Sequence, residues 1–469
     1  MAPASASAAL TSASTASASA ASAASAAPAS TSIAIKPHEE PPPEQPPRAR
    51  LGYFRTALQL LVLDNPSFAL LYIFLPLAVF TAQQHDTNAE TRLFFFSLLA
   101  IVPLADRLAY VTEQLAAHTN EVVAGLLNAS FGNVPELIVT AVAVSHSSED
   151  FAMQAIVGGV FNALLLGAGA SIFVGGLCHK EQRFNQANSS LLLSLVLLMA
   201  VFVALMTAAE QAQQPPSDSA LLSASHVLAV LSLVMYLSYL AFSLGTHREL
   251  FGDEDVDGAE KGETPLLSVG AAVLWMTALV VLIAYLTDMM VPAIEGASKH
   301  SGLPSLIITA VILPTVNNAA EIFVAVRMAC SGLIDASIAS SVGSAAQLSM
   351  LHIPVCILAD WAAGGLDPIG LGVNPVLAAT LGAGALFGGS VLSRGSATWM
   401  HGLLLLACYG GVVTVFWLTR VEDDAEGGAD RQLALHWHRH SPWAVFTPPS
   451  GQGRGGPTAD LRTTSLQPV

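Results

Sequence analysis

Long apolar runs, separated by short polar segments, dominate the hydrophobic pattern of the chain. A helix needs about 20 mostly apolar residues to cross the hydrocarbon core of a bilayer, so runs of this length predict membrane-spanning helices. We therefore expect an all-α polytopic membrane protein. The eleven predicted spans lie at residues 62–82, 92–111, 119–145, 151–177, 189–208, 221–244, 266–292, 303–329, 336–360, 372–393 and 399–419.

The composition excludes several classes of protein. Hydrophobic residues make up 53% of the 469 residues and charged residues 11%, whereas about a quarter of an average soluble domain is charged. A soluble fold is therefore excluded, and so is disorder for most of the chain. The net charge of −16 predicts no nucleic-acid partner, because phosphate binding needs a basic surface. The four cysteines show no CxxC spacing, and we interpret them as small apolar residues in helices.

Polar segments divide the chain into five parts. Residues 1–60 form an Ala-, Ser- and Pro-rich N-terminal tail, which we expect to be disordered and cytosolic, with an organelle targeting peptide as the alternative. Residues 61–250 hold one extra helix and a first transmembrane repeat. An acidic cytosolic loop at 251–265 leads to a second repeat at 266–420. The last part, 421–469, is predicted to be a disordered tail.

Basic residues gather on one side of the predicted helices, and positive charge prefers the cytosolic side of a membrane. This distribution places the N-terminus in the cytosol. The basic residues assigned to the cytosolic side are Arg48, Arg50, Arg55, Arg107, Lys180, Arg183, Arg248, Lys261, Arg327 and Arg394, against Arg92, Lys299 and Arg420 for the opposite side.

The loop after the sixth span is densely acidic, with Asp253, Glu254, Asp255, Asp257 and Glu260 close together. It does not complete the EF-hand pattern of acids at alternate positions, a central glycine and a closing glutamate, because Thr264 stands at the closing position. Two interpretations stay open, a solvated loop and an element that attracts or senses cations.

A motif recurs at an offset of 185 residues. Asn133-Val134-Pro135-Glu136 lies in the third span, and Asn318-Ala319-Ala320-Glu321 lies in the eighth. The same offset relates Asp150 to Asp335, Gly158 to Gly343, and Asn162 to Gln347. Because the copies are five spans apart, they are expected to cross the membrane in opposite senses. Inverted repeats are typical of secondary transporters, whose substrate site lies at the midplane between the repeats.

Glu136 and Glu321 are the acids that the predicted spans place deep in the membrane. A carboxylate at the centre of a membrane helix costs about 2.5–3.5 kcal/mol, so two at equivalent positions indicate a site. Their charges match one divalent cation, and Ca²⁺ prefers oxygen ligands. Asn133 and Asn318 stand one helical turn before them and are candidate neutral ligands. Other candidates on the neighbouring helices are Asn162, Ser344 and Gln347.

Helix-breaking residues surround both motifs, with Gly132 and Pro135 at the first and Pro314 before the second. A broken helix frees backbone carbonyls where the chain lines a cavity. We expect Gly158, Gly159, Gly343 and Ser344 to allow close approach of neighbouring helices.

The same two carboxylates can bind protons when the cation leaves. Competition between a metal ion and protons for one site is the basis of an antiporter. A pH gradient supplies about 1.4 kcal/mol per proton and pH unit. The chain holds no GxxxxGK[ST] motif, so we do not expect an ATP-driven pump. No HExxH or GxSxG motif lies near the membrane acids, so we expect no enzyme activity and no cofactor, with Ca²⁺ and H⁺ as the transported ions.

The sequence resembles the calcium/proton exchanger family of the calcium/cation antiporter superfamily over roughly residues 60–420. The resemblance rests on five segments: 103–107 (PLADR), 112–115 (TEQL), 125–138 (GLLNASFGNVPELI), 317–321 (NNAAE) and 343–350 (GSAAQLSM). It implies one extra helix plus two inverted five-helix repeats in the membrane of a vacuole or another acidic organelle. It also implies that Glu136 and Glu321 are the carboxylates that exchange cation and protons.

The resemblance further implies roles for acids outside the central motif. Glu113 and Asp335 match acidic positions near the cytosolic vestibule, and the loop of Asp253 to Glu260 matches a regulatory segment. The N-terminal tail matches in place a region that is autoinhibitory in some members.

Three positions depart from the family pattern. Asn317 stands where the family usually has Gly, which puts backbone flexibility there in doubt. Ile322 replaces a His directly after the second Glu, which removes a titratable group. Asn162-Ala163 replaces Ser-Asn, so that one ligand is shifted. His352 is a candidate replacement imidazole, with a hydrogen-bonded helix histidine as the alternative.

Several functions therefore remain open. The leading hypothesis is exchange of Ca²⁺, or of Mn²⁺, for protons. One alternative is a sodium-coupled calcium exchanger, which Val134-Pro135-Glu136 favours slightly. Another is a membrane protein that binds cations and regulates a partner without transport. The sequence leaves the oligomeric state open, a homo-oligomer included.

Overall fold

A computed structural model describes most of the region predicted to span the membrane. The described residues are 70–84, 88–119, 123–124, 127, 131–146, 149–250, 265–364 and 369–419, all within one compact unit that spans Phe54–Val469. The predicted N-terminal tail, the acidic loop from Asp253 to Glu260 and the tail at 421–469 lie outside the described residues. The five-part division and the orientation in the membrane stay predictions.

The first half of the described chain is helical. Its elements are η1 (Leu70–Ile73), α3 (Phe74–Thr81), α4 (Ala89–Ala116), α6 (Val134–Ser145), α7 (Glu149–Phe161), the π-helix η2 (Asn162–Gly167), α8 (Ala168–Cys178), α9 (Gln186–Glu210), α10 (Asp218–Ala241), the π-helix η3 (Phe242–Thr246) and η4 (Arg248–Leu250).

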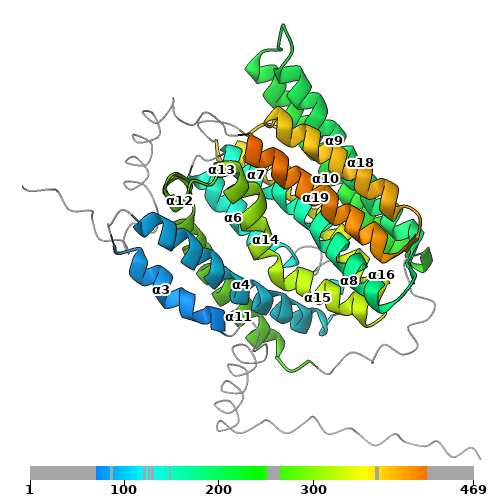
Figure 1. Cartoon of the computed structure of the whole chain (residues 1–469). Helices are drawn as coiled ribbons and strands as arrows, with labels where there is room; N and C mark the ends of the chain where they lie inside the picture. Colours follow the sequence, from blue (N-terminus) through cyan, green and yellow to red (C-terminus); the bar gives the residue numbers. More distant parts are fainter. Residues whose placement is uncertain are drawn as a thin grey trace, which may run out of the picture. The chain divides into compact units, whose positions relative to one another are not determined.

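The second half is built in the same way. Its elements are α11 (Val269–Met290), α12 (Ala293–Ser301), α13 (Ser305–Ile307), the π-helix η5 (Ile308–Ile312), α14 (Leu313–Asn317), α15 (Ala319–Cys330), α16 (Ile334–Gln347), the π-helix η6 (Leu348–His352), α17 (Ile353–Ala363), α18 (Pro375–Leu392) and α19 (Trp399–Leu418). In Figure 1, α6, α14 and α15 lie between α4 and α11 on one side and α9, α18 and α19 on the other.

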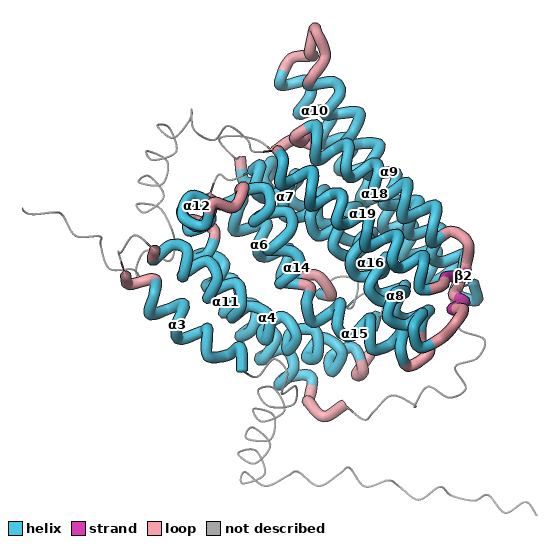
Figure 2. The backbone as a smooth tube through the Cα atoms, in the orientation of Figure 1, coloured by secondary structure: helices cyan, strands magenta, loops and turns pink. Residues whose placement is uncertain are grey.

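Two short strands are the described exception to the all-α prediction. β1 (Gln182–Arg183) follows α8, and β2 (Ser396–Ala397) precedes α19. They pair antiparallel, with Gln182 opposite Ala397 (Figure 2). The expected all-α membrane architecture is otherwise confirmed.

Eight helices in the described residues are long and apolar enough to cross a membrane. The number becomes nine if α12 and the segment Ser305–Asn317, bent by 115° relative to each other, count as one span. Leu70–Thr81 and Val134–Ser145 are shorter apolar helices. The predicted total of eleven therefore stays a prediction. The spans predicted at 119–145 and 303–329 are not continuous helices, because each is interrupted just before its glutamate.

The repeat found in the sequence is also present in the helix bounds. Adding 185 to the first and last residue numbers of α6 gives those of α15. The same addition to α8 gives the bounds of α17. α7 and α16 begin at equivalent residues, Glu149 and Ile334, and both continue into a π-helix. Asn162 opens η2, and its equivalent Gln347 directly precedes η6. Turns of π-helix are rare in proteins, and those that occur often lie at functional sites. Their presence at equivalent places therefore supports a shared functional role for the two copies.

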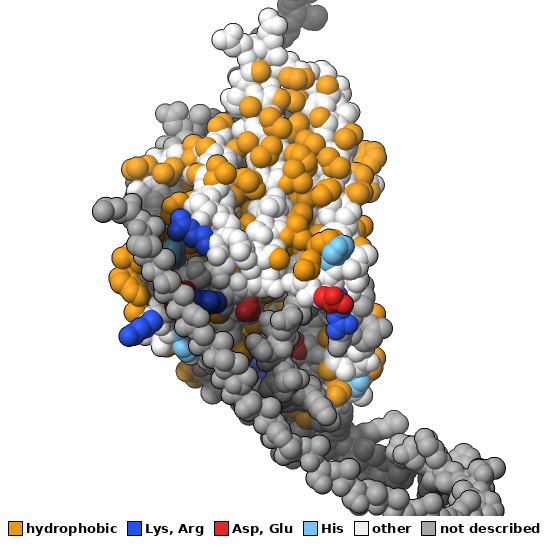
Figure 3. All heavy atoms as spheres, turned by 90° about the vertical axis from the view of Figure 1, so that its right-hand side faces the viewer, with side chains coloured by type: hydrophobic (Ala, Val, Ile, Leu, Met, Phe, Trp, Pro, Cys, Tyr) orange, Lys and Arg blue, Asp and Glu red, His pale blue; other side chains and the backbone are white. Residues whose placement is uncertain are grey.

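Apolar side chains form both the interior and part of the surface. One buried cluster gathers residues of α7 to α10 and α16 to α19, and a second gathers residues of α3, α4, α6, α11 and α12. On α10, large apolar side chains are exposed at Val227, Val230, Val234 and Leu237. Figure 3 shows hydrophobic side chains over the upper part of one face and charged side chains lower down. An apolar surface of this kind suits contact with lipid.

Two glycines that the repeat relates have different surroundings. A Cβ atom built on Gly158 of α7 would lie 2.2 Å from the backbone oxygen of Ala310 in η5. A Cβ atom on Gly159 would lie 3.0 Å from Leu348. The expected close approach is therefore confirmed for the first copy. It is wrong for Gly343, whose Cβ would meet nothing within 4 Å among the described residues, because no described helix packs closely over that position.

This difference predicts unequal effects of two matched substitutions. Gly158→Ala should lower the stability by about 1–3 kcal/mol, because α7 must move away from a backbone oxygen. Gly343→Ala should leave the stability unchanged or slightly higher, because alanine favours a helix over glycine. Thermal unfolding of the purified protein in detergent measures both. Equal midpoints for the two variants would contradict the close contact at Gly158.

Candidate functional site

Both candidate carboxylates lie in the first turn of a helix that begins inside the bundle. Asn133 is the N-cap residue of α6, and Asn318 is that of α15. Glu136 and Glu321 are therefore each the third residue of their helix. Asn is favoured at this position, and Pro135 suits the start of α6. The positive end of a helix dipole stabilises a nearby negative charge. The predicted helix breaks thus place each carboxylate at a favourable helix end.

The two helices begin with equivalent backbone hydrogen bonds. Leu137 N–H donates to Asn133 O at 3.2 Å, and Ile322 N–H donates to Asn318 O at 2.9 Å. Neither asparagine side chain caps its own helix. Their side chains are therefore not used to start the helix and can make other contacts.

A chain of hydrogen bonds joins the two copies of the motif. Ser344 Oγ donates to Asn133 Oδ1 at 2.9 Å and lies 2.8 Å from Glu321 Oε1. Asn133 Nδ2 donates to Gln347 Oε1 at 2.8 Å. Asn133 is 1% exposed, and Gln347 and Ser344 are also buried. The structure thus brings together Asn133 from the first copy with Glu321, Ser344 and Gln347 from the second.

Asn162 also links the two copies. It belongs to the first copy and bonds the helix that precedes the second motif. Its Nδ2 donates to Pro314 O at 3.2 Å, and Thr315 Oγ1 donates to its Oδ1 at 3.2 Å. Thr315 also bonds the Tyr409 hydroxyl at 2.9 Å. Asn162 is fully buried. Its described partners lie on α14, so its side chain ties the repeats together beside the site.

A small cavity lies next to Glu136. Its walls are formed by residues of α6, α7 and α14: Glu136, Val139, Thr140, Ala155, Ile156, Leu313, Pro314 and Asn317. Glu136 is 9% exposed and Asn317 is 5% exposed. The sequence pattern indicated changed backbone flexibility at Asn317 but did not predict that this residue lines the cavity. The difference between Asn317 and its equivalent Gly132 in the first copy could have pointed to it.

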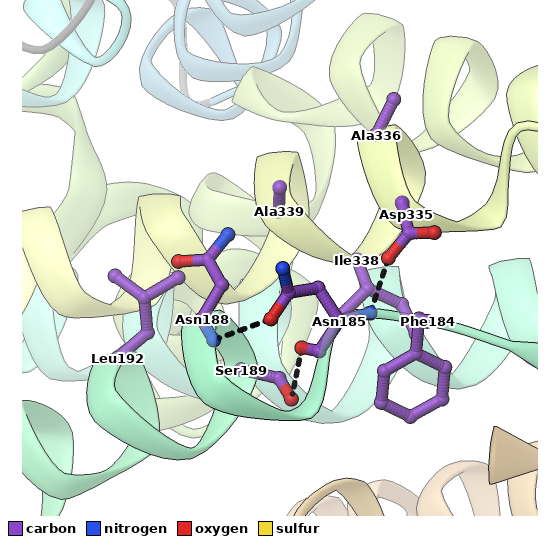
Figure 4. Close-up of a pocket in the computed structure, with 9 residues that line it drawn as sticks. All are labelled: Phe184, Asn185, Asn188, Ser189, Leu192, Asp335, Ala336, Ile338 and Ala339. Carbon is purple, nitrogen blue, oxygen red and sulfur yellow. Dashed lines mark hydrogen bonds between the residues drawn. The ribbon is translucent and has the colours of Figure 1, made fainter. Parts of the chain in front are cut away.

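The proposed vestibule acids lie on separate elements. Glu113 is exposed near the end of α4. Asp335, in the first turn of α16, accepts a hydrogen bond from Asn185 N–H at the start of α9. Figure 4 shows Asp335 beside Asn185 and Phe184 in a pocket between these two helices. The acids from Asp253 to Glu260 lie outside the described residues, so no described contact links them to either position.

The helix α4 continues to Ala116, beyond the span end predicted at residue 111, so that Asp106 lies well inside it. Arg107, 7% exposed, bonds Asp106 through its guanidinium. This pair neutralises an acid in the apolar helix.

His352 is buried in η6, and its ring Nδ1 lies 3.3 Å from Gln347 O. It is not among the residues that line the cavity beside Glu136. The contact favours the alternative of a hydrogen-bonded helix histidine over a replacement ligand.

Comparison with known proteins identifies the family. The sodium/calcium exchanger protein family matches residues 90–245 and 271–418. The chain belongs to this family. This exchanger is 33% identical over 359 residues to the vacuolar cation/proton exchanger 2 of Oryza sativa subsp. japonica, covering 74% of this chain and 81% of the relative. It is 33% identical to the Ca²⁺/H⁺ antiporter of Synechocystis, covering 74% and 96%. The resemblance to calcium/proton exchangers is confirmed.

Solved structures agree on the fold. The structure of native YfkE matches this exchanger with a TM-score of 0.62 at 25% sequence identity, covering 75% of this chain and 99% of YfkE. The crystal structure of the H⁺/Ca²⁺ exchanger CAX matches with a TM-score of 0.55 at 15% identity, covering 82% and 98%. The second likeness concerns the fold alone.

The hydrogen bonds of Ser344 predict a cost for its removal. Ser344→Ala leaves the buried Asn133 oxygen without this donor, which should lower the stability of this exchanger by about 1–3 kcal/mol. Ser349→Ala is the matched control, because its buried hydroxyl bonds only Ala346 O of its own helix among the described residues. Thermal unfolding without added cation measures both variants. A Ser344→Ala midpoint no lower than that of Ser349→Ala would contradict the proposed link.

Proposed function

We propose that this chain exchanges a divalent cation, Ca²⁺ in the first place, for protons by alternating access at a site that Glu136 and Glu321 share. The observation that carries the proposal is the placement of both carboxylates at interrupted helices, linked across the repeats through Ser344 and Asn133. The names of the vacuolar cation/proton exchanger and the Ca²⁺/H⁺ antiporter support the same exchange.

Each residue of the site has a chemical role in this proposal. The two glutamates supply the negative charge that a divalent cation needs, and the amide oxygens of Asn133 and Asn318 supply neutral ligands. Ser344 and Gln347 hold Asn133 in place. The interrupted backbone before α6 and α15 adds carbonyl oxygens. Asn162 fixes α14 against the first copy.

The exchange follows from the charge of the site. When Ca²⁺ leaves, two carboxylates remain in an apolar environment, and binding protons neutralises them. Cation and protons therefore occupy the site in turn. Exchange of one Ca²⁺ for two protons would keep the charge of the site constant during the movement across the membrane.

The proposed location is the membrane of a vacuole or another acidic organelle. A compartment more acidic than the cytosol drives cation uptake, because protons leave down their gradient while the cation enters. Mn²⁺ is the second proposed cargo, since it accepts the same oxygen ligands.

Substitution of either glutamate tests the shared site. Glu136→Gln and Glu321→Gln should each reduce ⁴⁵Ca²⁺ uptake into acidified vesicles to background, because each removes one charge and one proton-binding group. Glu181→Gln is the control, since this glutamate is exposed and pairs with Arg183. Its uptake should equal that of the unmodified protein. Normal flux in either site variant would refute the two-carboxylate site.

The driving ion is tested separately in the same vesicles. Collapse of the pH gradient should abolish Ca²⁺ uptake, and removal of Na⁺ should leave it unchanged. Uptake that survives the collapse and requires Na⁺ would establish sodium coupling instead. Ca²⁺ binding without any flux would favour a regulatory protein that does not transport.

A further inference from the structure

Asn317 places a side chain in the site where the first repeat has none. It is the last residue of α14, and its equivalent in the first copy is Gly132. Asn317 lines the same small cavity as Glu136, which belongs to the other repeat. The site is therefore asymmetric: the second copy contributes an additional amide group at a position where the first copy has a glycine.

The amide oxygen of Asn317 has no hydrogen-bond partner among the described residues, although the residue is 95% buried. Buried polar atoms in folded proteins almost always have a partner, because desolvation without one is costly. The Asn133 oxygen, by contrast, accepts a hydrogen bond from Ser344. An unpartnered oxygen that shares a cavity with a carboxylate points to a ligand with positive charge.

We propose that Asn317 is a ligand of the transported cation, supplying a neutral oxygen beside Glu136. This inference rests on the proposed function for the identity of the cation. A carbonyl oxygen and a carboxylate repel each other electrostatically, and a divalent cation between them is attracted to both. A polar hydrogen from water would satisfy the Asn317 oxygen without adding to cation affinity, so the two cases differ in a measurable way.

An additional neutral oxygen favours a large cation over a small one. Ca²⁺ takes six to eight oxygens in flexible geometry, whereas Mg²⁺ requires six in a near-ideal octahedron and keeps several waters. Asn317 should therefore raise the affinity for Ca²⁺ more than that for Mg²⁺. The extra ligand makes Asn317 a selectivity residue as well as a binding residue.

The test is equilibrium binding of ⁴⁵Ca²⁺ to the purified full-length protein in detergent at fixed pH, with Mg²⁺ as competitor. Asn317→Ala and Asn317→Gly should each weaken Ca²⁺ binding by about tenfold or more, the range seen when supporting groups of metal sites are removed. Asn317→Asp should keep the affinity or raise it. The preference for Ca²⁺ over Mg²⁺ should fall in the Ala and Gly variants.

Asn374→Ala is the matched control, because it removes an exposed asparagine that caps α18 and does not line the cavity. It should bind Ca²⁺ as the unmodified protein does. The thermal midpoint of every variant shows that the chain remains folded, and the Asp variant keeps the test valid if removal of the amide prevents folding.

Unchanged Ca²⁺ affinity in both the Ala and the Gly variant would overturn the inference. A loss in Gly alone would also overturn it, because backbone freedom and not the oxygen would then be responsible. Weakened binding in both variants, together with uptake that does not need a pH gradient, would uphold Asn317 as a ligand and refute proton exchange. Proton-driven uptake with unchanged Ca²⁺ affinity in both variants would uphold proton exchange and refute Asn317 as a ligand.

Discussion

The central physical constraint is the burial of two carboxylates within apolar helices. A charged side chain in the middle of a membrane helix is unfavourable, and the structure reduces this cost by ending one helix and starting another at each glutamate. Glu136 and Glu321 thereby lie at helix starts, where the dipole favours negative charge. The side chain of Asn133 does not cap its own helix and instead bonds residues of the other repeat.

The packing around the site follows from the same constraint. An interrupted helix loses backbone hydrogen bonds at the break, so neighbouring elements must stabilise the helix ends there. Asn162 bonds Pro314 O, and Gly158 allows α7 to approach η5 closely. These contacts run between the repeats, so neither copy completes the site without the other. The duplication thus provides two similar halves, while Asn317 opposite Gly132 makes them unequal.

The sequence predicts much of this fold because its strongest signals are long apolar runs and a repeated motif. The offset of 185 residues, found from a few polar residues, reproduces the bounds of α15 and α17 from those of α6 and α8. Interruption of the spans at 119–145 and 303–329 was expected from Pro135, Pro314 and Gly132. The residue of each break was not predicted, since proline marks a region and tertiary contacts select the residue.

Other features depend on distances between segments that are remote in the chain. Gly158 and Gly343 are equivalent in sequence, yet only Gly158 meets a backbone oxygen. The role of Asn317 depends on which side of α14 faces the cavity. The pair of Asp106 and Arg107 lies within α4, which continues beyond the span end predicted at residue 111. Local pattern does not contain this information, because it arises when the two repeats pack.

The pairing of β1 with β2 has a mechanical consequence. β1 lies in the connection between α8 and α9, and β2 lies in the connection between α18 and α19. Backbone hydrogen bonds thus fasten a connection of the first repeat to one of the second. Separation of the repeats at this edge would break those bonds, whereas rotation about it would preserve them. The short ribbon is therefore a main-chain link that any relative movement of the repeats has to accommodate.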